Sequence, residues 1–410
     1  MISGTPLQKH CLLRNLILYT AFGLVILNAK TAASELHLSK KSGSPKRDGQ
    51  AQCKVLRTMA RVYMAGGDYS KAQPLAENAM TLAKKNNSDS ELCLCLIDLA
   101  YLYKNQGRFD DAQSMCETAL KLQKKLYYEN HPHIAGTLRI LSSIYQGQAK
   151  YNQARTAMEQ AIAIMRKSHL PDDPTLAPFQ VDLARVMVEQ GKFDEAESNY
   201  LQALELINNS YGPNHLYTAG VLGSIAELYT RQGKYSKAED LINQTLVIQQ
   251  RVYGSKHHLM VPTWLTLARI HQAKQEYDEA EKLLKKALTV VEKDCGVEHP
   301  LNGKIMSLLG RLYIEQKKYA QAQIICEQAA NILENSLGPE NDYTAIAYNN
   351  LARVYISQEK YSQAQQLCDR ALNTLENIFE PNHPDIAQVH QTMAQLQQRT
   401  QKTAEVAKLM

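Results

Sequence analysis

The chain has 410 residues, of which 44% are hydrophobic and 21% are charged, and these fractions exclude a largely disordered protein. Gly and Pro, with 19 and 13 residues, are too scarce for a turn-rich β architecture. The net charge of +5 arises before residue 53, and the remainder carries equal numbers of basic and acidic side chains. A neutral folded region disfavours nucleic acid as a partner.

Residues 1–33 have the features of an export signal. An apolar run from Leu16 to Leu27 follows Lys9 and Arg14 and precedes small residues that suit cleavage after Ala33. The run is shorter than the ~20 residues that a membrane-spanning helix needs. We therefore expect an exported protein, either periplasmic or secreted.

Two alternatives for this segment stay open. An uncleaved membrane anchor over residues 12–33 would leave more positive charge after the segment than before it, and would place the folded region in the cytoplasm. A buried helix is the other reading. Residues 34–52 show no apolar period, which predicts a flexible tether.

A repeat of 42 residues organises the rest of the chain. An alanine marks each unit, with a step of 40 after the first: Ala72, Ala112, Ala154, Ala196, Ala238, Ala280, Ala322 and Ala364. An aromatic residue stands three positions before each: Tyr69, Phe109, Tyr151, Phe193, Tyr235, Tyr277, Tyr319 and Tyr361. Apolar residues spaced three and four apart predict two helices, A and B, in each unit. Because one hairpin cannot bury its apolar face alone, the units must stack into a solenoid.

The turn between helices A and B often contains Gly, as at Gly191 and Gly233. The later repeats have Gln275, Lys317 and Glu359 there instead. We expect an energetic cost at these positions if the turn requires a positive φ.

The pattern resembles the tetratricopeptide repeat in its 42-residue form, typical of kinesin light chains. The resemblance rests on links such as Gly212-Pro213-Asn214-His215 and on the helix-opening motif Tyr348-Asn349-Asn350-Leu351-Ala352. It implies an all-α, right-handed superhelical solenoid over residues 53–405, with eight repeats and a C-terminal half-repeat. It also implies a scaffold for protein–protein interaction.

Histidine and cysteine give no sign of a metal site. Five histidines share one repeat position with Asp173 and Asn341: His131, His215, His257, His299 and His383. A polar residue just before a helix, often followed by Pro, predicts an N-cap. Core positions are expected for Cys116, Cys326 and Cys368, and different facings for Cys93 and Cys95. We expect no cofactor.

The sequence also lacks the common catalytic motifs. It contains no Gly-rich phosphate loop, no Gly-x-Ser-x-Gly and no His-Glu-x-x-His. We therefore expect no enzymatic activity.

We give the name ladder to one position of helix A, two residues after an apolar position that is Leu in most repeats. It reads Arg61, Tyr101, Ser143, Arg185, Glu227, Arg269, Arg311 and Arg353. In the tetratricopeptide folds that this sequence resembles, helix A lines a concave groove and this position points into it. The guanidinium fork can hold a carboxylate with two hydrogen bonds. We predict a groove for an acidic or C-terminal peptide formed by Arg185, Arg269, Arg311, Arg353, Asn349 and Asn350.

Three alternatives remain. The ladder arginines could pair with acids on adjacent helices and have only a structural role. The protein could be an assembly factor of an envelope complex that acts through the convex face or the end of the solenoid. It could also be a regulatory solenoid that responds to a small ligand.

Overall fold

A computed structural model describes residues 45–409, apart from 169–172, 256, 380 and 382. The described residues form seventeen α-helices and two short 3₁₀ helices, and none of them lies in a strand. The predicted all-α solenoid of helical hairpins is confirmed. The predicted leader, 1–33, lies outside the described residues.

The helices alternate between the two predicted types. The A helices are α3 (Pro45–Ala65), α5 (Asp89–Asn105), α7 (Pro132–Gly147), α9 (Ala177–Glu189), α11 (Leu216–Arg231), α13 (Val261–Ala273), α15 (Pro300–Glu315), α17 (Asp342–Ser357) and α19 (Pro384–Leu409). The B helices are α4 (Tyr69–Lys85), α6 (Phe109–Leu126), α8 (Tyr151–Ser168), α10 (Phe193–Tyr211), α12 (Tyr235–Tyr253), α14 (Tyr277–Cys295), α16 (Tyr319–Leu337) and α18 (Tyr361–Ile378). The 3₁₀ helices η1 (Pro174–Leu176) and η2 (His258–Met260) precede α9 and α13.

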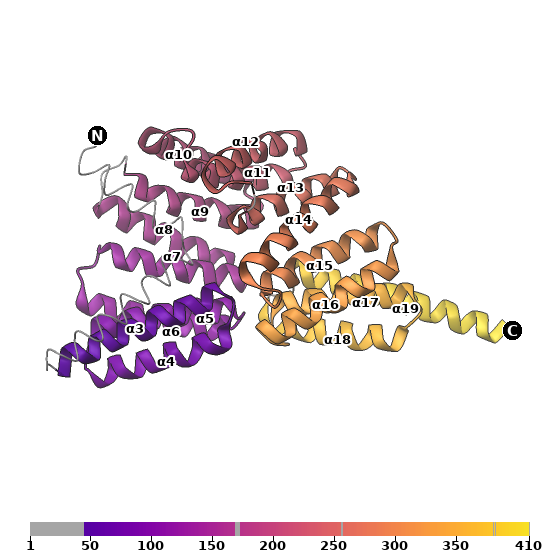
Figure 1. The fold of residues 1–410 in the computed structure, drawn as a ribbon, viewed down its shortest axis with the longest axis horizontal. Coiled ribbons are helices and arrows are strands. Elements are labelled where there is room, and N and C mark those ends of the chain that lie inside the picture. The colour runs from indigo at the N-terminus through magenta and orange to yellow at the C-terminus, as the bar shows by residue number, and fades with distance from the viewer. Residues whose placement is uncertain (1–44, 169–172, 256, 380, 382, 410) are drawn as a thin grey trace. The chain divides into compact units, whose positions relative to one another are not determined.

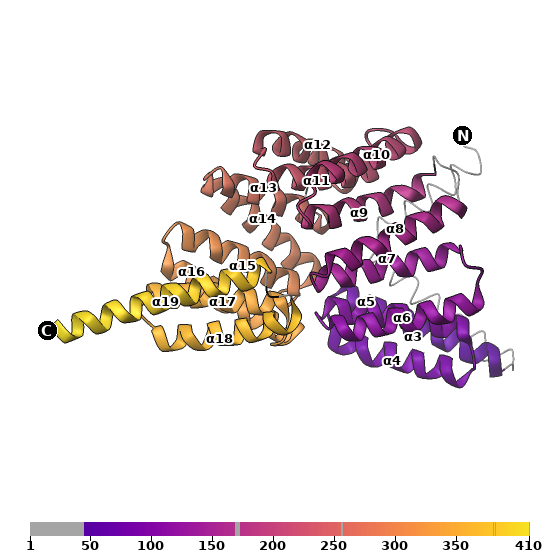
Figure 2. The same cartoon turned by 180° about the vertical axis from the view of Figure 1, so that it is seen from behind.

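The chain divides into two compact units. Among the described residues, one unit comprises 45–102 and 114–127, and the other comprises 103–113 and 128–409. Within the second unit, the hairpins from α7 to α18 follow one another in chain order (Figure 1). Helix α19 packs on α17 and α18, and its C-terminal part extends past both of them in the two views (Figures 1 and 2).

The repeated alanines form the contact between helices A and B. All eight have an exposed fraction of 0%, and each B helix begins at the aromatic residue three positions earlier. A small side chain is needed there because a larger one would push the helix axes apart. Cys116, Cys326 and Cys368 are also buried, as predicted.

Neighbouring hairpins are tied together by tyrosines near the ends of the A helices. The hydroxyl of Tyr229 in α11 donates to Glu197 of α10 at 2.7 Å, and that of Tyr313 in α15 donates to Glu281 of α14 at 2.9 Å. These tyrosines therefore link the fifth and the seventh hairpin to the hairpin before each of them.

The predicted N-caps are confirmed. At each such position a side chain accepts a hydrogen bond from the backbone N–H two residues later: His131, Asp173, His215, His257, His299, Asn341 and His383. The ring nitrogen Nδ1 accepts only when it is deprotonated. Burial lowers the pKa of His215, which favours this neutral form.

The turn between helices A and B does require a positive φ. The angle is 73° at Gly233, and it is 63° at Gln275, 59° at Lys317 and 62° at Glu359. Ala149, at the same position in the third repeat, has a φ of 57°, which the sequence analysis missed. These turns therefore hold side chains in a conformation that suits glycine.

The N-terminal end of the repeat array differs from expectation in detail. Helix α3 begins at Pro45, so residues 45–52 are helical although the sequence predicted a tether over 34–52. At the other end, α19 buries Ile386, Val389 and Leu396 in the core cluster of the last hairpin. This helix therefore covers the final repeat. In the described part of the chain, no helix combines the length and apolar character needed to cross a membrane.

Candidate functional site

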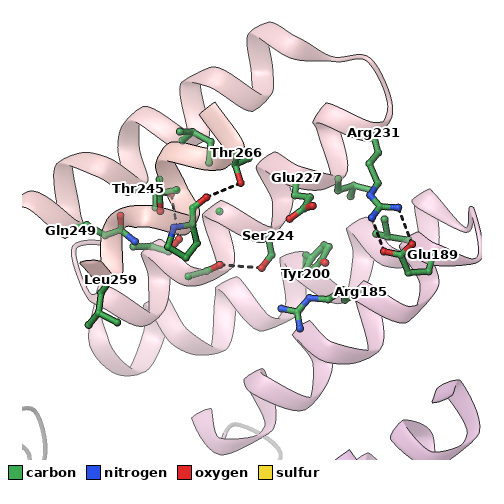
Figure 3. A pocket seen from close by; sticks show the side chains of 18 residues that line it. Arg185, Glu189, Tyr200, Ser224, Glu227, Arg231, Thr245, Gln249, Leu259 and Thr266 are labelled. Atoms are coloured by element: carbon green, nitrogen blue, oxygen red, sulfur yellow. Dashed lines mark hydrogen bonds and ion pairs between the residues drawn. The ribbon is translucent and has the colours of Figure 1, made fainter. Parts of the chain in front are cut away.

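A cavity of about 340 Å³ lies on the A-helix face of repeats four to six (Figure 3). It is lined by residues of α9, α11 and α13, with parts of α10 and α12 behind them. Arg185 and Glu227, two members of the ladder, line it. In these repeats the ladder position therefore faces the cavity, and its use as a peptide groove stays a prediction.

The floor of the cavity is open because α11 has small residues there. A Cβ atom at Gly220 would meet nothing within 4 Å, and one at Gly223 would only touch Thr245 at 4.0 Å. The Ser224 hydroxyl donates back to the Gly220 carbonyl at 3.1 Å. A partner could therefore approach the helix backbone closely at this point.

The charged side chains around the cavity are mostly paired with one another. Arg231 binds Glu189 through two hydrogen bonds of 2.9 and 2.6 Å (Figure 3). Arg185 donates to Asp182 at 2.8 Å. The first pair joins successive A helices, and the second joins two turns of one helix. Such pairs are what we expect if the ladder arginines have only a structural role.

One acceptor in the cavity lacks a partner. The Oε1 atom of Gln249 is buried and accepts no hydrogen bond within the described structure. Tyr200, behind the same wall, stays neutral because burial raises the pKa of its hydroxyl to about 12. A ligand that donates a hydrogen bond, such as a peptide N–H, would satisfy Gln249.

The ladder continues from the cavity into repeats six to eight. Arg269 donates to Glu227 at 3.1 Å and to the Thr266 hydroxyl at 3.4 Å, and both of these residues line the cavity. Arg269 therefore lies against the rim of the cavity.

Arg311 is a largely buried cation of the ladder whose hydrogen bonds are incompletely satisfied. Its Nη2 donates to the Gln272 amide oxygen at 3.5 Å, and its Nε is buried without a partner among the described residues. Burial lowers the pKa of Arg311, and the positive charges of Arg269 and Arg353 lower it further. The side chain of Arg353 has no hydrogen bond or ion pair within the described residues, 45–409 with their gaps, and only its backbone carbonyl accepts, from Ser357.

Two carboxylates partly compensate the positive charge of Arg311 without forming an ion pair with it. Glu315 and Asp385 raise the pKa of Arg311 through space. Glu315 accepts from Gln272 at 2.7 Å, the same amide that Arg311 contacts. Asp385 is in the first turn of α19, and burial raises the pKa of its carboxyl group.

The two asparagines of the predicted groove are buried, with exposed fractions of 2% for Asn349 and 3% for Asn350. The Asn350 amide donates to the Ser307 hydroxyl at 2.9 Å and to its carbonyl at 3.3 Å. The Asn349 carbonyl oxygen is buried and has no partner in the described structure. Asn350 therefore links α17 to α15, while Asn349 keeps an unused acceptor.

The structure adds a charged cluster that the sequence analysis missed. The Lys304 ammonium of α15 lies over the Tyr343 ring of α17, 3.4 Å from its centroid. Burial raises the pKa of the neighbouring Asp342 to about 6, although Lys304 opposes this shift. The repeat pattern does not predict this cluster, because Lys304 and Asp342 occupy different positions of the repeat.

A metal centre is not indicated in the part of the chain that is described. No group of three or more His, Cys, Asp or Glu side chains converges there. The histidines of the repeat position act as N-caps on separate hairpins.

Comparisons with known proteins identify the repeat. The profile named "Tetratricopeptide repeat" matches residues 175–251, 221–293, 259–335, 303–367 and 343–410. A second profile, "MalT-like TPR region", matches residues 42–198. The chain belongs to the tetratricopeptide repeat family. This repeat fold serves protein interaction and is typically non-enzymatic.

Several solved structures share the tetratricopeptide fold. A Rap protein complexed with competence and sporulation factor aligns with a TM-score of 0.58 and 13% identity, over 89% of this chain and 98% of that one. The apo quorum sensor NprR of B. thuringiensis aligns with a TM-score of 0.53 and 17% identity, over 86% of this chain and 99% of that one.

Kinesin-light-chain-like repeats are also among the matches. A putative kinesin light chain of Podosopora anserina has 23% identity and a TM-score of 0.43, over 52% of this chain and 100% of that one. A comparison with curated proteins gave no match.

Proposed function

We propose that this tetratricopeptide repeat protein is a non-enzymatic scaffold that binds an acidic segment of a partner protein. The segment lies along the A helices of repeats six to eight, α13, α15 and α17. Arg269, Arg311 and Arg353 supply its charge recognition.

The observation that carries this proposal is the state of Arg311. A guanidinium that is partly removed from water and lacks strong acceptors is destabilised, and a bound carboxylate would relieve that cost. Arg353 offers a second cation, whose side chain has no partner among the described residues, and Arg269 offers a third that Glu227 already neutralises in part. A carboxylate at Arg311 would also screen the repulsion among the three.

We expect successive ladder arginines to be about one helix spacing apart, and this spacing would suit an extended peptide. Helices that pack against each other lie about 8–10 Å apart. A polyproline II segment has three residues per turn and rises ~3.1 Å per residue, so every third side chain lies on one face ~9 Å further along. We therefore expect acidic residues at every third position to meet successive arginines.

The cavity extends the same surface toward repeat four. Its unsatisfied acceptor, Gln249 Oε1, and the bare backbone at Gly220 suit a peptide main chain. In this arrangement, the cavity binds main-chain N–H groups of the peptide, and the arginines bind its side-chain carboxylates.

The direct test is a titration of the full chain with a labelled peptide that has Asp at every third position. Replacing Arg311 with Ala should weaken binding by about 1.5–3 kcal/mol, which is about 10–150-fold in Kd. A peptide of the same composition with the Asp residues adjacent should bind more weakly than the spaced peptide.

A matched control is available on a B helix. Arg251 of α12 is exposed, and its one hydrogen bond among the described residues goes to Asn214 at 3.4 Å, so Arg251→Ala removes the same charge away from the ladder. It should leave the affinity unchanged. Equal loss in both variants would show that net charge alone attracts the peptide, and no loss in Arg311→Ala would refute the site.

A small-ligand function has one observation in its favour. The cavity volume of about 340 Å³ lies within the range of ~300–1,000 Å³ typical of small-molecule sites. If metabolites raise the melting temperature of the chain while acidic peptides do not, this second function replaces the first.

We also propose that the protein is exported. The support is the apolar run from Leu16 to Leu27 between basic and small residues. Fractionation of cells that produce the chain, with determination of its mature N-terminus, tests this. A mature chain that begins after Ala33 supports export, and an intact leader in the membrane fraction supports the anchor instead.

A further inference from the structure

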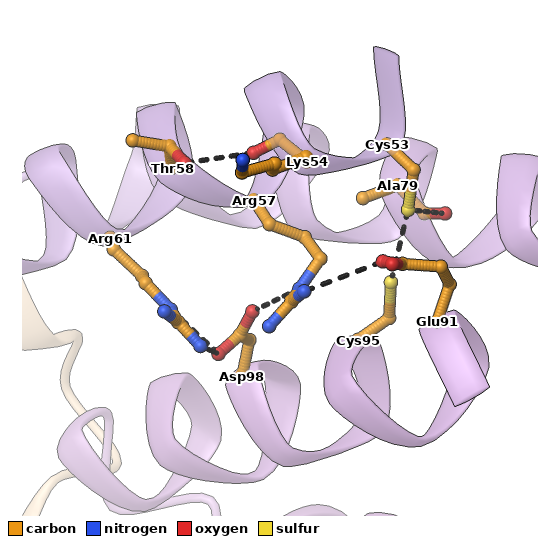
Figure 4. A network of polar contacts seen from close by, with 9 residues as sticks. All are labelled: Cys53, Lys54, Arg57, Thr58, Arg61, Ala79, Glu91, Cys95 and Asp98. Atoms are coloured by element: carbon orange, nitrogen blue, oxygen red, sulfur yellow. Dashed lines mark hydrogen bonds and ion pairs between the residues drawn. The ribbon is translucent and has the colours of Figure 1, made fainter. Parts of the chain in front are cut away.

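Two cysteines lie in contact at the N-terminal end of the repeat array, outside the proposed groove. The Sγ atoms of Cys53 in α3 and Cys95 in α5 are 3.6 Å apart (Figure 4). Their exposed fractions are 0% and 1%. Both are free thiols in the structure, and both belong to the unit formed by residues 45–102 and 114–127.

Ion pairs around the thiols hold the two helices together. Arg57 of α3 is 8% exposed and donates to Asp98 of α5 at 2.7 Å (Figure 4). Arg61, one turn later, donates to the other oxygen of Asp98 at 2.7 Å. Glu91 accepts from Arg57 at 3.4 Å. These contacts fix the register between α3 and α5, and this register brings the sulfurs together.

The repeat itself provides a comparison for Cys53. Because the first repeat is 40 residues long, Cys93 is the residue equivalent to Cys53, and each thiol donates to a carbonyl 26 residues later, that of Ala79 or Ala119. The residue equivalent to Cys95 in the following repeat is Thr137, so the position next to Cys93 has no thiol. Cys93 therefore has the same setting without a second thiol.

We propose that Cys53 and Cys95 are a redox modification site whose disulfide clamps the first repeat onto the second. A disulfide requires an S–S distance of about 2.05 Å, so the sulfurs must approach by about 1.5 Å. The oxidant is a small-molecule disulfide such as oxidised glutathione.

The reaction proceeds by two thiol–disulfide exchanges. The Cys53 thiolate attacks one sulfur of oxidised glutathione, the glutathione S–S bond breaks, and one glutathione leaves and takes up a proton. The Cys95 thiol then loses its proton to solvent and attacks the Cys53 sulfur, releasing the second glutathione. Two protein thiols are oxidised by two electrons, and one oxidised glutathione becomes two reduced molecules.

The surroundings favour Cys53 as the attacking sulfur. The hydrogen bond from Cys95 is the largest influence on the pKa of Cys53 and lowers it, and Arg57 acts in the same direction, while burial and Glu91 oppose the shift only in part. At the equivalent position, burial raises the pKa of Cys93 to about 11. The thiolate, which is the reactive form, is therefore better stabilised on Cys53.

The test uses the full chain refolded from the reduced, denatured state in a glutathione redox buffer, so that burial does not limit access. After acid quenching and alkylation, peptide mapping should find the Cys53–Cys95 disulfide in most molecules of the wild type. Cys93→Ala, which removes an equally buried thiol, should form it to the same extent. Cys95→Ala should leave Cys53 either alkylated or held as the mixed disulfide with glutathione, because the second exchange cannot take place.

A second measurement tests the clamp. Proteolytic cleavage within residues 53–95 should be at least about tenfold slower in the oxidised than in the reduced chain, because the bond suppresses opening of the terminal repeat. Cys95→Ala should cleave at the same rate under both conditions. A mapped disulfide population in which Cys53–Cys95 is no more abundant than Cys53–Cys93, or equal cleavage of the oxidised and reduced wild type, would overturn the proposal.

Discussion

Glu227 and Arg269 occupy the same position in two consecutive repeats and form an ion pair with a length of 3.1 Å. The pair joins α11 to α13, as the bidentate pair of Glu189 and Arg231 joins α9 to α11. No such acid precedes Arg311, because its counterpart one repeat earlier is Arg269 itself. Repeat five has Glu at this position and the next repeats have Arg. Arg269 can therefore pair with the acid before it, whereas Arg311 adds positive charge that no acid at this position neutralises.

The Asp385 carboxylate is predicted to compete with the proposed ligand. It acts on Arg311 through space from the first turn of α19. Replacing it with Asn should strengthen binding of the acidic peptide several-fold, because a compensating negative charge is removed. Isothermal titration of wild type and Asp385→Asn measures this effect. Weaker binding in the variant would show that Asp385 orders the site instead of competing for it.

The cavity makes a separate prediction through Gly220. A side chain there would enter open space, so Gly220→Leu should fill the cavity while keeping α11 helical. Binding of a long peptide that reaches repeat five should fall, whereas a short peptide confined to repeats six to eight should bind as before. Gly220→Ala, which adds a single methyl group, serves as the control. Equal affinity of the long peptide for both variants would exclude the cavity from the site.

The turns with positive φ offer a stability test. Lys317→Gly should raise the free energy of unfolding by about 0.5–1 kcal/mol, because Gly adopts this conformation without steric cost. Gly233→Ala, where the added methyl meets no neighbour, should lower it by a similar amount. Urea denaturation followed by circular dichroism measures both. A destabilised Lys317→Gly chain would mean that the lysine side chain contributes more than the backbone strain removes.

Asp342 should make stability depend on pH in an unusual direction. Its pKa is about 6 in the folded chain, against an ordinary value of 3.8, so between these values the folded state binds more protons than the unfolded state. Stability should therefore fall as the pH rises from about 4 to 6, with a contribution on the order of 1–3 kcal/mol. Asp342→Asn should flatten this part of the profile. An unchanged profile would show that Lys304 compensates the carboxylate fully.

The repeated features of the fold could be predicted from the sequence because each follows from a local rule. Ala322 has to be small where two helices cross, His299 has to cap a helix, and Lys317 sits at a turn position that other repeats fill with Gly. These rules use only neighbours along the chain. The position of each residue within its repeat was therefore enough.

The pairing of side chains between repeats could not be predicted in the same way. Arg269 and Arg311 occupy one repeat position, yet only Arg269 meets a carboxylate. The outcome depends on rotamers and on residues two repeats away, such as Asp385. The contact of Cys53 with Cys95 was missed because it joins positions that the repeat alignment sets two residues apart.

The most direct test of the proposed groove is an exchange of charge between the chain and its ligand. Fluorescence anisotropy would measure binding of two peptides, one with Asp and one with Lys at every third position, to the wild type and to a variant with Glu at 269, 311 and 353. Both proteins must first show equal helicity. Our account predicts that the wild type selects the Asp peptide and the variant selects the Lys peptide. Unchanged affinity of the variant for the Asp peptide would contradict it and leave the arginine ladder with a structural role.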